Sequence, residues 1–176
     1  MPDSLSSDQF TLTFTVIDEA DRAGFADEDD LESLAMCILR AEGATGAWDV
    51  TVALVGEARL KQLHAEFMGI DTATDIMTFP TEAGPGMERG GDLVISVDHV
   101  REWASETESA SEDELRFLVA HGLLHLLGWR DETDRERQSM LERQQEIIDA
   151  WKKDCLDTTG QLIEARQSFA GDLNPD

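Results

Sequence analysis

Two histidines and an aspartate late in the chain have the residue types and the spacing of a metal site. His121 and His125 stand four residues apart in the apolar run FLVAHGLLHLLGW, and this spacing places them one turn apart on the same face of an α-helix. Gly128 can adopt the left-handed conformation that ends a helix, so Asp131 can reach the same point from the returning chain. Two imidazoles and a carboxylate, with a fourth position open to water, are typical of a catalytic zinc site. We therefore predict one Zn²⁺ ion on His121, His125 and Asp131.

The alternative for the two histidines is a structural role inside a buried helix. Leucines surround both of them, which indicates that this helix is apolar on every side. A buried polar group without a partner costs a few kcal/mol. Two imidazoles on one face of such a helix therefore favour metal binding over packing alone.

The elements that must position these residues are short strands and amphipathic helices. Alternating apolar and polar residues predict strands at 10–17, 49–55, 76–79 and 92–96. Apolar stripes at helical spacing predict helices at 27–40, 57–68, 98–105, 111–127 and 133–151, with the run 111–114 and its acids capping the fourth of them. The predicted fold class is α+β, with a small mixed β-sheet, helices packed on it and the metal site on a central buried helix.

Two features of the third strand and the segment after it bear on the site. Pro80 either ends this strand or confines it to an edge of the sheet. The segment 81–91 carries four glycines and a proline and is predicted to be a loop. It is either a long hairpin connection or a lid over the site.

Length and composition predict one acidic globular domain. The 176 residues accommodate a single domain at 10–153, a flexible N-terminus at 1–9 and a polar C-terminal tail at 154–176. The 38 acidic and 14 basic residues give a net charge of -24. Such a charge disfavours a nucleic-acid partner unless the basic residues gather in one place or salt screens the field. A carboxylate-rich surface also suits a salt-rich cytoplasm.

A cytoplasmic location is predicted from the absence of targeting signals in the sequence. The first ten residues do not combine a basic segment with an apolar one, and no apolar run is long enough to span a bilayer. Cys37 and Cys155 are far apart and lack the spacing of a metal or redox motif. We expect both to be reduced thiols, as in cytosolic proteins.

Three segments, in this order, resemble one known family. TDIMTFP at 74–80, GDLVIS at 91–96 and HGLLHLLGW at 121–129 are similar to the YbeY family of bacterial endoribonucleases, the rRNA maturation factors. The resemblance implies a zinc-dependent enzyme that cuts the single-stranded 3′ end of 16S rRNA and takes part in ribosome quality control. The partners it implies are the rRNA and the ribosome, with ribosomal proteins or a ribosome-associated GTPase in addition. No membrane and no dinucleotide cofactor are expected.

The sequence departs from the family pattern at three positions. His121 and His125 match the first two metal ligands, whereas Asp131 stands where the family has a third histidine. A carboxylate oxygen binds zinc at about the same distance as an imidazole nitrogen, so this exchange is compatible with a metal site. The family's asparagine and arginine positions hold His64 and Met68. Without the guanidinium, a bidentate donor to RNA phosphate is lost, while His64 is either a substrate contact or a packed helix residue.

The resemblance and the ligand set together predict metal-assisted hydrolysis of a phosphodiester bond. Asp75 and Glu132 are the candidate catalytic residues, which would orient or deprotonate the attacking water. Asp75 has the alternatives of capping a turn or accepting a ring N–H from a metal-bound histidine. Glu132 has the alternative of replacing Asp131 as a ligand. Arg130 and Arg89 are candidates for phosphate contacts, each with a surface salt bridge as its alternative.

Two other functions stay open. A zinc metallopeptidase has the same ligand spacing, but its base glutamate directly follows the first histidine, and Gly122 stands there. A non-catalytic ribosome assembly factor would keep the fold and the metal without cutting RNA. Basic ribosomal proteins would be natural partners for so acidic a surface.

Overall fold

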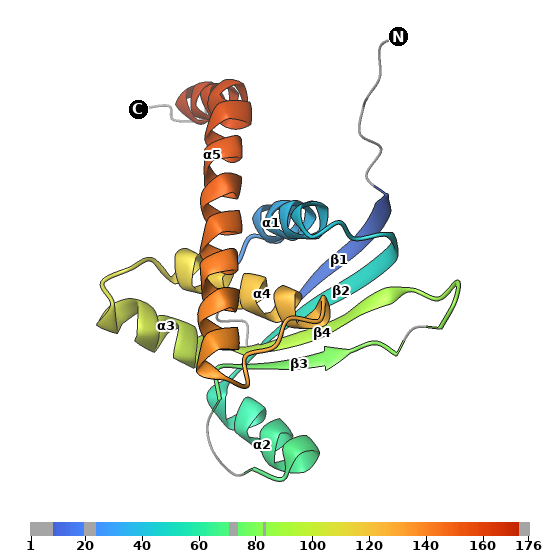
Figure 1. Ribbon diagram of the computed structural model, residues 1–176. Helices are drawn as coiled ribbons and strands as arrows, with labels where there is room; N and C mark the ends of the chain where they lie inside the picture. The colour runs from blue at the N-terminus through green and yellow to red at the C-terminus, as the bar shows by residue number, and fades with distance from the viewer. Residues whose placement is uncertain (1–8, 20–23, 71–73, 83, 173–176) are drawn as a thin grey trace.

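The computed structural model describes residues 9–19, 24–70, 74–82 and 84–172, and the side chains among them as far as Asp154 (Figure 1). Most of the predicted N-terminal segment 1–9 and the side chain of Cys155 therefore lie outside the described residues. The elements are β1 (Phe10–Asp18), α1 (Glu28–Ala41), β2 (Gly46–Val55), α2 (Glu57–Met68), β3 (Ile76–Pro80), β4 (Arg89–Ser96), α3 (Val97–Glu106), α4 (Ser111–Leu126) and α5 (Asp134–Asp172).

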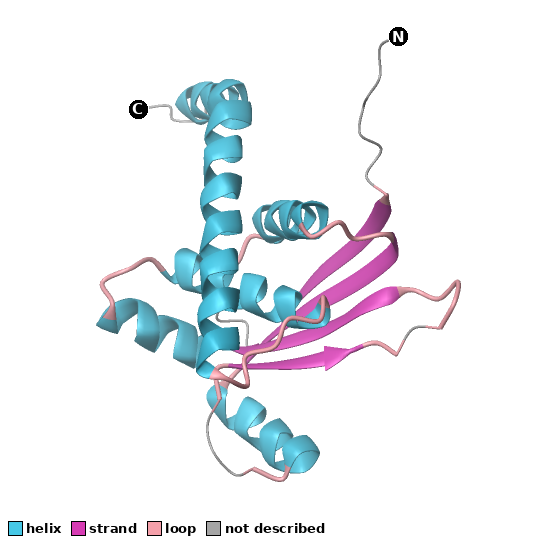
Figure 2. Ribbon diagram, in the orientation of Figure 1, coloured by secondary structure: helices cyan, strands magenta, loops and turns pink. Residues whose placement is uncertain are grey.

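The four strands form one mixed sheet in the order β1-β2-β4-β3, which confirms the predicted α+β class (Figure 2). β1 and β2 run parallel, as do β2 and β4, whereas β3 is antiparallel to β4. β3 is an edge strand, so Pro80 leaves no central hydrogen bond unmade. Of the two interpretations of the glycine-rich segment, the structure has the hairpin connection between β3 and β4.

The sheet buries both of its faces because successive side chains along a strand point to opposite sides. The larger core lies on the face covered by α1, α4 and α5, and the sheet contributes Val50, Val52, Leu54, Leu93 and Ile95 to it. The smaller core lies on the opposite face, where Leu60 of α2 packs with Val55, Met77 and Val94. α2 is thus separated by the sheet from α1, α4 and α5.

Two glycines at the start of β4 let the strand pass close to its neighbours. They were predicted as part of the loop, but Gly90 and Gly91 have φ values of 116° and 148° within the strand. A Cβ atom would lie 2.2 Å from the backbone oxygen of Asp49 at Gly90, and 2.2 Å from that of Phe79 at Gly91. The same Cβ at Gly91 would lie 3.0 Å from Leu126 Cδ2. The carboxyl end of α4 therefore packs closely against Gly91 of β4.

α5 crosses α4 and holds it against the rest of the main core (Figure 1). Its predicted apolar stripe is buried, and the members are Met140, Ile147, Ile148 and Trp151. The indole Nε1 of Trp151 donates to Ser33 Oγ of α1 at 3.1 Å. The helix continues to Asp172, well beyond the predicted end near Trp151. None of the helices in the described residues combines the length and the apolar character that a membrane crossing requires.

An arginine ties α4 to α1 beside the same tryptophan. Arg116 donates to Asp30 Oδ2 at 2.8 Å and to Asp113 Oδ1 at 2.9 Å, and its guanidinium lies over the Trp151 ring. Burial disfavours the charged guanidinium, but the bonds to Asp30 and Asp113 outweigh this effect and raise the pKa of Arg116. The predicted acids Glu112, Asp113 and Glu114 lie in the first turn of α4, but the N-cap residue is Ala110, which makes no side-chain cap bond.

Candidate metal centre

The chain reverses sharply at the carboxyl end of α4, as the sequence predicts. Gly128 has a φ of 102° and donates its N–H to the carbonyl of His125 at 3.0 Å. Trp129 donates its N–H to the carbonyl of Leu124 at 2.9 Å. These two bonds form the Schellman motif, which requires a positive φ at the residue after the cap. The reversal brings Asp131 back along α4.

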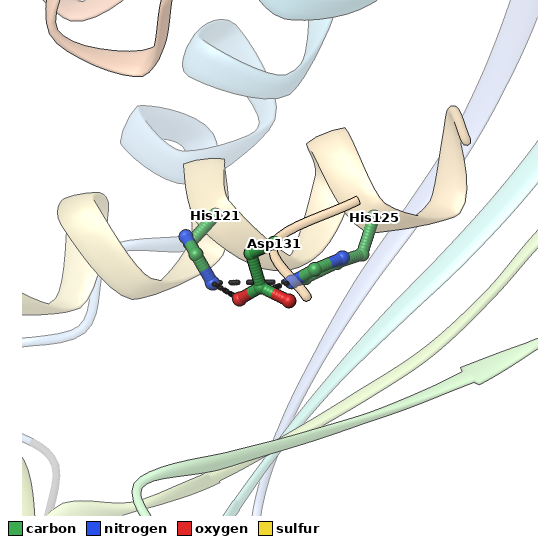
Figure 3. A group of neighbouring side chains, drawn as sticks. All are labelled: His121, His125 and Asp131. Atoms are coloured by element: carbon green, nitrogen blue, oxygen red, sulfur yellow. Dashed lines mark hydrogen bonds and ion pairs between the residues drawn. The ribbon is translucent and has the colours of Figure 1, made fainter. Parts of the chain in front are cut away.

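His121, His125 and Asp131 converge on one point (Figure 3). The Nε2 atoms of the two histidines are 3.2 Å apart. The Oδ2 atom of Asp131 lies 3.5 Å from Nε2 of His121 and 3.4 Å from Nε2 of His125. The side chains are 18%, 23% and 37% exposed, so an ion from solvent can reach them. The three residues predicted as ligands therefore form a cluster that could hold a metal ion.

The outer nitrogens of both imidazoles already have partners. His125 Nδ1 lies 3.0 Å from the backbone oxygen of Trp129, and His121 Nδ1 lies 3.1 Å from Oε1 of Gln144. A carbonyl oxygen can only accept, so in each neutral ring Nδ1 carries the proton and Nε2 presents a lone pair. Two lone pairs and a carboxylate oxygen then face each other within 3.5 Å. This arrangement is favourable only with a cation between them.

The spacing of the three atoms fits zinc. In a tetrahedral site with bonds of about 2.0–2.1 Å, neighbouring ligand atoms lie roughly 3.3 Å apart. The measured separations of 3.2, 3.4 and 3.5 Å lie around that value. Two imidazoles also suit zinc better than magnesium or calcium, which prefer oxygen ligands.

The two candidate catalytic acids, Glu132 and Asp75, each contact a residue outside the metal cluster. The Glu132 carboxylate forms an ion pair with Arg130, and both side chains are exposed. Asp75 Oδ2 lies 3.8 Å from His99 Nε2, and the Asp75 carbonyl accepts from the Ser96 N–H at 3.0 Å. Among the described residues, neither acid belongs to the metal cluster. Their catalytic roles stay predictions.

Gly122 shows why a peptidase base cannot stand beside His121. A Cβ atom at this position would lie 2.7 Å from Leu93 Cδ2 and 3.0 Å from Ile76 Cδ1. The position therefore faces the packed sheet and not the metal cluster. A glutamate there would bury its carboxylate in the main core, at a cost of several kcal/mol.

α2 carries the two positions where the sequence departs from the family pattern. Met68, the last residue of this helix, is 61% exposed, and His64 is half-buried. Phe67 is 62% exposed and packs edge-on against Phe79, with ring centroids 5.4 Å apart. The described surface at this helix end is therefore apolar where the family pattern has a cation.

A cavity of about 610 Å³ adjoins the loop that carries Asp131. It is lined by Leu127, Gly128, Trp129, Arg130, Thr133, Arg135, Glu136 and Ser139. The two arginines and two hydroxyls offer donors to an anionic ligand. Sequence reasoning identified Arg130 but missed Arg135, because nothing local relates the first turn of α5 to the end of α4. Arg89 begins β4 and lines a separate cavity with Trp48.

Gln144 was also missed. It is a polar residue within the apolar stripe of α5, and its side chain is completely buried. That position is one turn from both Met140 and Ile148, so a polar residue there was the available signal.

Comparisons with known proteins agree with this fold. A family model described as Endoribonuclease YbeY matches residues 16–152. The Endoribonuclease YbeY of Bacillus subtilis is 33% identical over 149 residues, which cover 77% of this chain and 95% of the relative. That of Nautilia profundicola is 42% identical over 100 residues, 57% of this chain and 70% of the relative. The solution structure of TM1509 from Thermotoga maritima superimposes with a TM-score of 0.58 at 26% identity, covering 85% of this chain and 95% of that one.

Proposed function

The chain belongs to the YbeY endoribonuclease family, and we propose that it is a zinc-dependent endoribonuclease that cuts single-stranded RNA. The observation that carries the proposal is the convergence of His121, His125 and Asp131 within 3.5 Å, with a hydrogen-bond acceptor beside the outer nitrogen of each histidine. When bound there, a zinc ion supplies Lewis acidity that activates water and polarises a phosphoryl oxygen.

The protein itself fixes the positions of these three side chains before an ion binds. The Schellman turn and the bonds to Trp129 O and Gln144 Oε1 orient the ligands in advance. Asp131 differs from a third histidine in adding a negative charge to the site. That charge offsets part of the metal's charge and makes the centre a weaker acid than three imidazoles would.

The cavity beside the centre is the proposed seat of the RNA backbone. Arg130, which directly precedes Asp131, and Arg135 of α5 both line this cavity, together with the acid Glu136. Guanidinium groups bind phosphate oxygens through two parallel hydrogen bonds. Arg130 would exchange its present partner Glu132 for phosphate, which would free that carboxylate to take the proton of the attacking water.

Asp75 is the second proposed catalytic acid, with a role in orienting the water. It directly precedes β3, and its carboxylate lies beside His99 of α3. Its present neighbour His99 is more than a third exposed, so this contact holds the carboxylate only weakly.

The proposals on the RNA substrate, the partners and the cellular location rest on the family resemblance. We propose the 3′ end of 16S rRNA as the substrate, with roles in its maturation and in ribosome quality control. The ribosome, its proteins or an associated GTPase would be partners, and the cytoplasm the location. A non-catalytic assembly factor is the second candidate, and the exposed Met68 in place of an arginine is the observation that favours it.

The test combines metal content with RNA cleavage in the parent, Asp131→Ala and Asp134→Ala. Asp134 is a matched control because it lies three residues away, is fully exposed and contacts only Arg137 among the described ion pairs. We expect close to one zinc per chain by plasma mass spectrometry, and cleavage of a single-stranded oligoribonucleotide but not of a duplex. Both properties should be lost in Asp131→Ala and kept in Asp134→Ala.

The outcomes separate the two candidates. Zinc without cleavage in the parent, together with recovery of ribosomal proteins, would replace the nuclease by the assembly factor. A parent that takes up no zinc, or cleavage that survives Asp131→Ala, would overturn the proposed centre.

A further inference from the structure

Gln144 is one of two fully buried polar side chains in the described core, and it links α5 to a metal ligand. The side chain is 0% exposed. Its Nε2 donates to the backbone oxygen of Phe117 at 2.9 Å, and its Oε1 lies 3.1 Å from Nδ1 of His121. Both contacts bridge from α5 to α4, at residues one helical turn apart.

The orientation of this amide is dictated by its two partners. The Phe117 carbonyl can only accept a hydrogen bond, so the NH₂ group of Gln144 must face it. The amide oxygen therefore faces His121 and can only accept. Nδ1 of His121 must carry the ring proton, which leaves Nε2 as the lone pair directed at His125 and Asp131. The reversed orientation would place the amide oxygen against the Phe117 carbonyl oxygen, with no donor between these two buried acceptors.

We propose that Gln144 is a positioning residue that sets the tautomer and the ring orientation of His121 for metal binding. This inference rests on the proposed metal site and goes beyond it, because it assigns a role to a residue of α5 that touches neither metal nor substrate. His125 has its equivalent partner in the backbone oxygen of Trp129, four residues away in the same turn. His121 instead depends on a side chain from another helix, 23 residues along the chain.

The consequence is that metal affinity depends on the docking of α5. The buried apolar residues Met140, Ile147 and Ile148 lie on either side of Gln144 along α5. Their packing fixes the position of Gln144 against α4. Partners of metal-bound histidines typically contribute 10–100-fold to metal affinity. We therefore expect Gln144→Leu, which keeps the size and removes the acceptor, to bind Zn²⁺ about 10–100-fold more weakly.

The test uses the full-length protein and two readouts, one of which needs no metal. Zn²⁺ affinity is measured by competition with a chromophoric chelator. The tautomer of His121 is read in the metal-free protein from ¹⁵N chemical shifts and two-bond couplings of the imidazole ring. Four proteins are compared: the parent, Gln144→Leu, Gln144→Glu and Ile148→Ala. Ile148→Ala is the control, since it weakens the packing of α5 one turn away and leaves the amide in place.

The parent should show His121 protonated at Nδ1. Gln144→Leu should show a mixture of tautomers and the loss of affinity. Gln144→Glu keeps an acceptor towards His121 and should restore the Nδ1 proton and most of the affinity, but it loses the donor to the Phe117 carbonyl and should lower the melting temperature. Ile148→Ala should lower the melting temperature without changing the tautomer.

Each result decides for or against the inference. Gln144→Leu with the parental tautomer and affinity would overturn it, and so would an Ile148→Ala variant that reproduces both changes. If Gln144→Leu does not fold, the comparison of Gln144→Glu with Ile148→Ala carries the same decision. A parent that binds no Zn²⁺ but shows the Gln144-dependent tautomer would refute the metal site and uphold the positioning role.

Discussion

α4 and α2 pack on opposite faces of the same sheet and differ in how firmly they are held. Seven residues of α4 are buried, whereas Leu60 is the one buried residue of α2. α4 carries two of the three residues that could hold a metal ion, and both of these imidazoles have partners for their outer nitrogens. α2 carries the position of the family's arginine and ends in the exposed Phe67 and Met68.

The difference between α4 and α2 follows from the precision that metal binding and phosphate binding each require. A metal centre tolerates errors of only a few tenths of an ångström in its ligands, so it needs a helix locked by packing on several sides. A contact to RNA phosphate is made by a long side chain at the surface, and a loosely held helix is sufficient for it. α4 matches the family pattern at both of its candidate ligands, while α2 has Met68 in place of the family's cation.

The largest expected effect comes from disturbing the support under α4. Gly91→Ala should lower the free energy of unfolding by about 3 kcal/mol or more, because a Cβ there adds backbone strain and overpacking. The new atom would lie 2.2 Å from the Phe79 oxygen, which cannot move without breaking the β3–β4 pairing. Urea denaturation measures the change.

Gly84→Ala is the matched control for this substitution. A Cβ at Gly84 would meet Met87 Sδ at an ordinary 3.6 Å. Its free energy of unfolding should stay close to that of the parent. Equal stability of the two variants would show that α4 does not depend on the close approach at Gly91.

A smaller effect is expected from returning the cation to α2. Met68→Arg should tighten the binding of a single-stranded oligoribonucleotide by up to about ten-fold, or about 1.4 kcal/mol. One additional phosphate contact should also steepen the salt dependence of binding by about 0.7 in log–log slope. Fluorescence anisotropy at several salt concentrations measures both quantities, and the melting temperature should not change.

Met87→Arg controls for net charge, because Met87 is 60% exposed in the β3–β4 connection. It adds the same charge at a different place. If both variants gain equally, the effect is a general reduction of repulsion by a chain of charge -24, and α2 lies outside the RNA path.

The smallest effect should come from salt alone. The many carboxylates on exposed helix surfaces repel one another, whereas the inner face of α4 is apolar. Raising KCl from low to molar concentration should therefore raise the melting temperature by about 2–4 °C, which corresponds to about 1 kcal/mol. Calorimetry with sucrose at equal osmolality separates screening from solvent exclusion. A melting temperature that stays flat in KCl would count against self-repulsion and against adaptation to a salt-rich cytoplasm.

Sequence patterns predicted the ligand trio because its geometry is local. His121 and His125 are related by one helical turn, and Gly128 supplies the positive φ that returns Asp131 to them. The strands and helices were predicted for the same reason, with most boundaries within a few residues. The end of α5 was missed because its apolar stripe stops near Trp151 although the helix continues.

Other features arise only when distant segments meet. Gly122 matters because Leu93 lies beneath it, and Gly91 matters because the Phe79 carbonyl and Leu126 approach it. No local pattern relates these pairs, since their separation along the chain bears no relation to helical or strand periodicity.

The sequence by itself therefore determined which three residues can bind the metal, through helical periodicity and one glycine. The tertiary structure decided the rest: which side chain lies against Nδ1 of His121, and which face of the sheet carries α2. The physical reason is that a buried hydrogen bond such as that from His121 to Gln144 is specified by the packing of α5 on α4, which no short segment encodes.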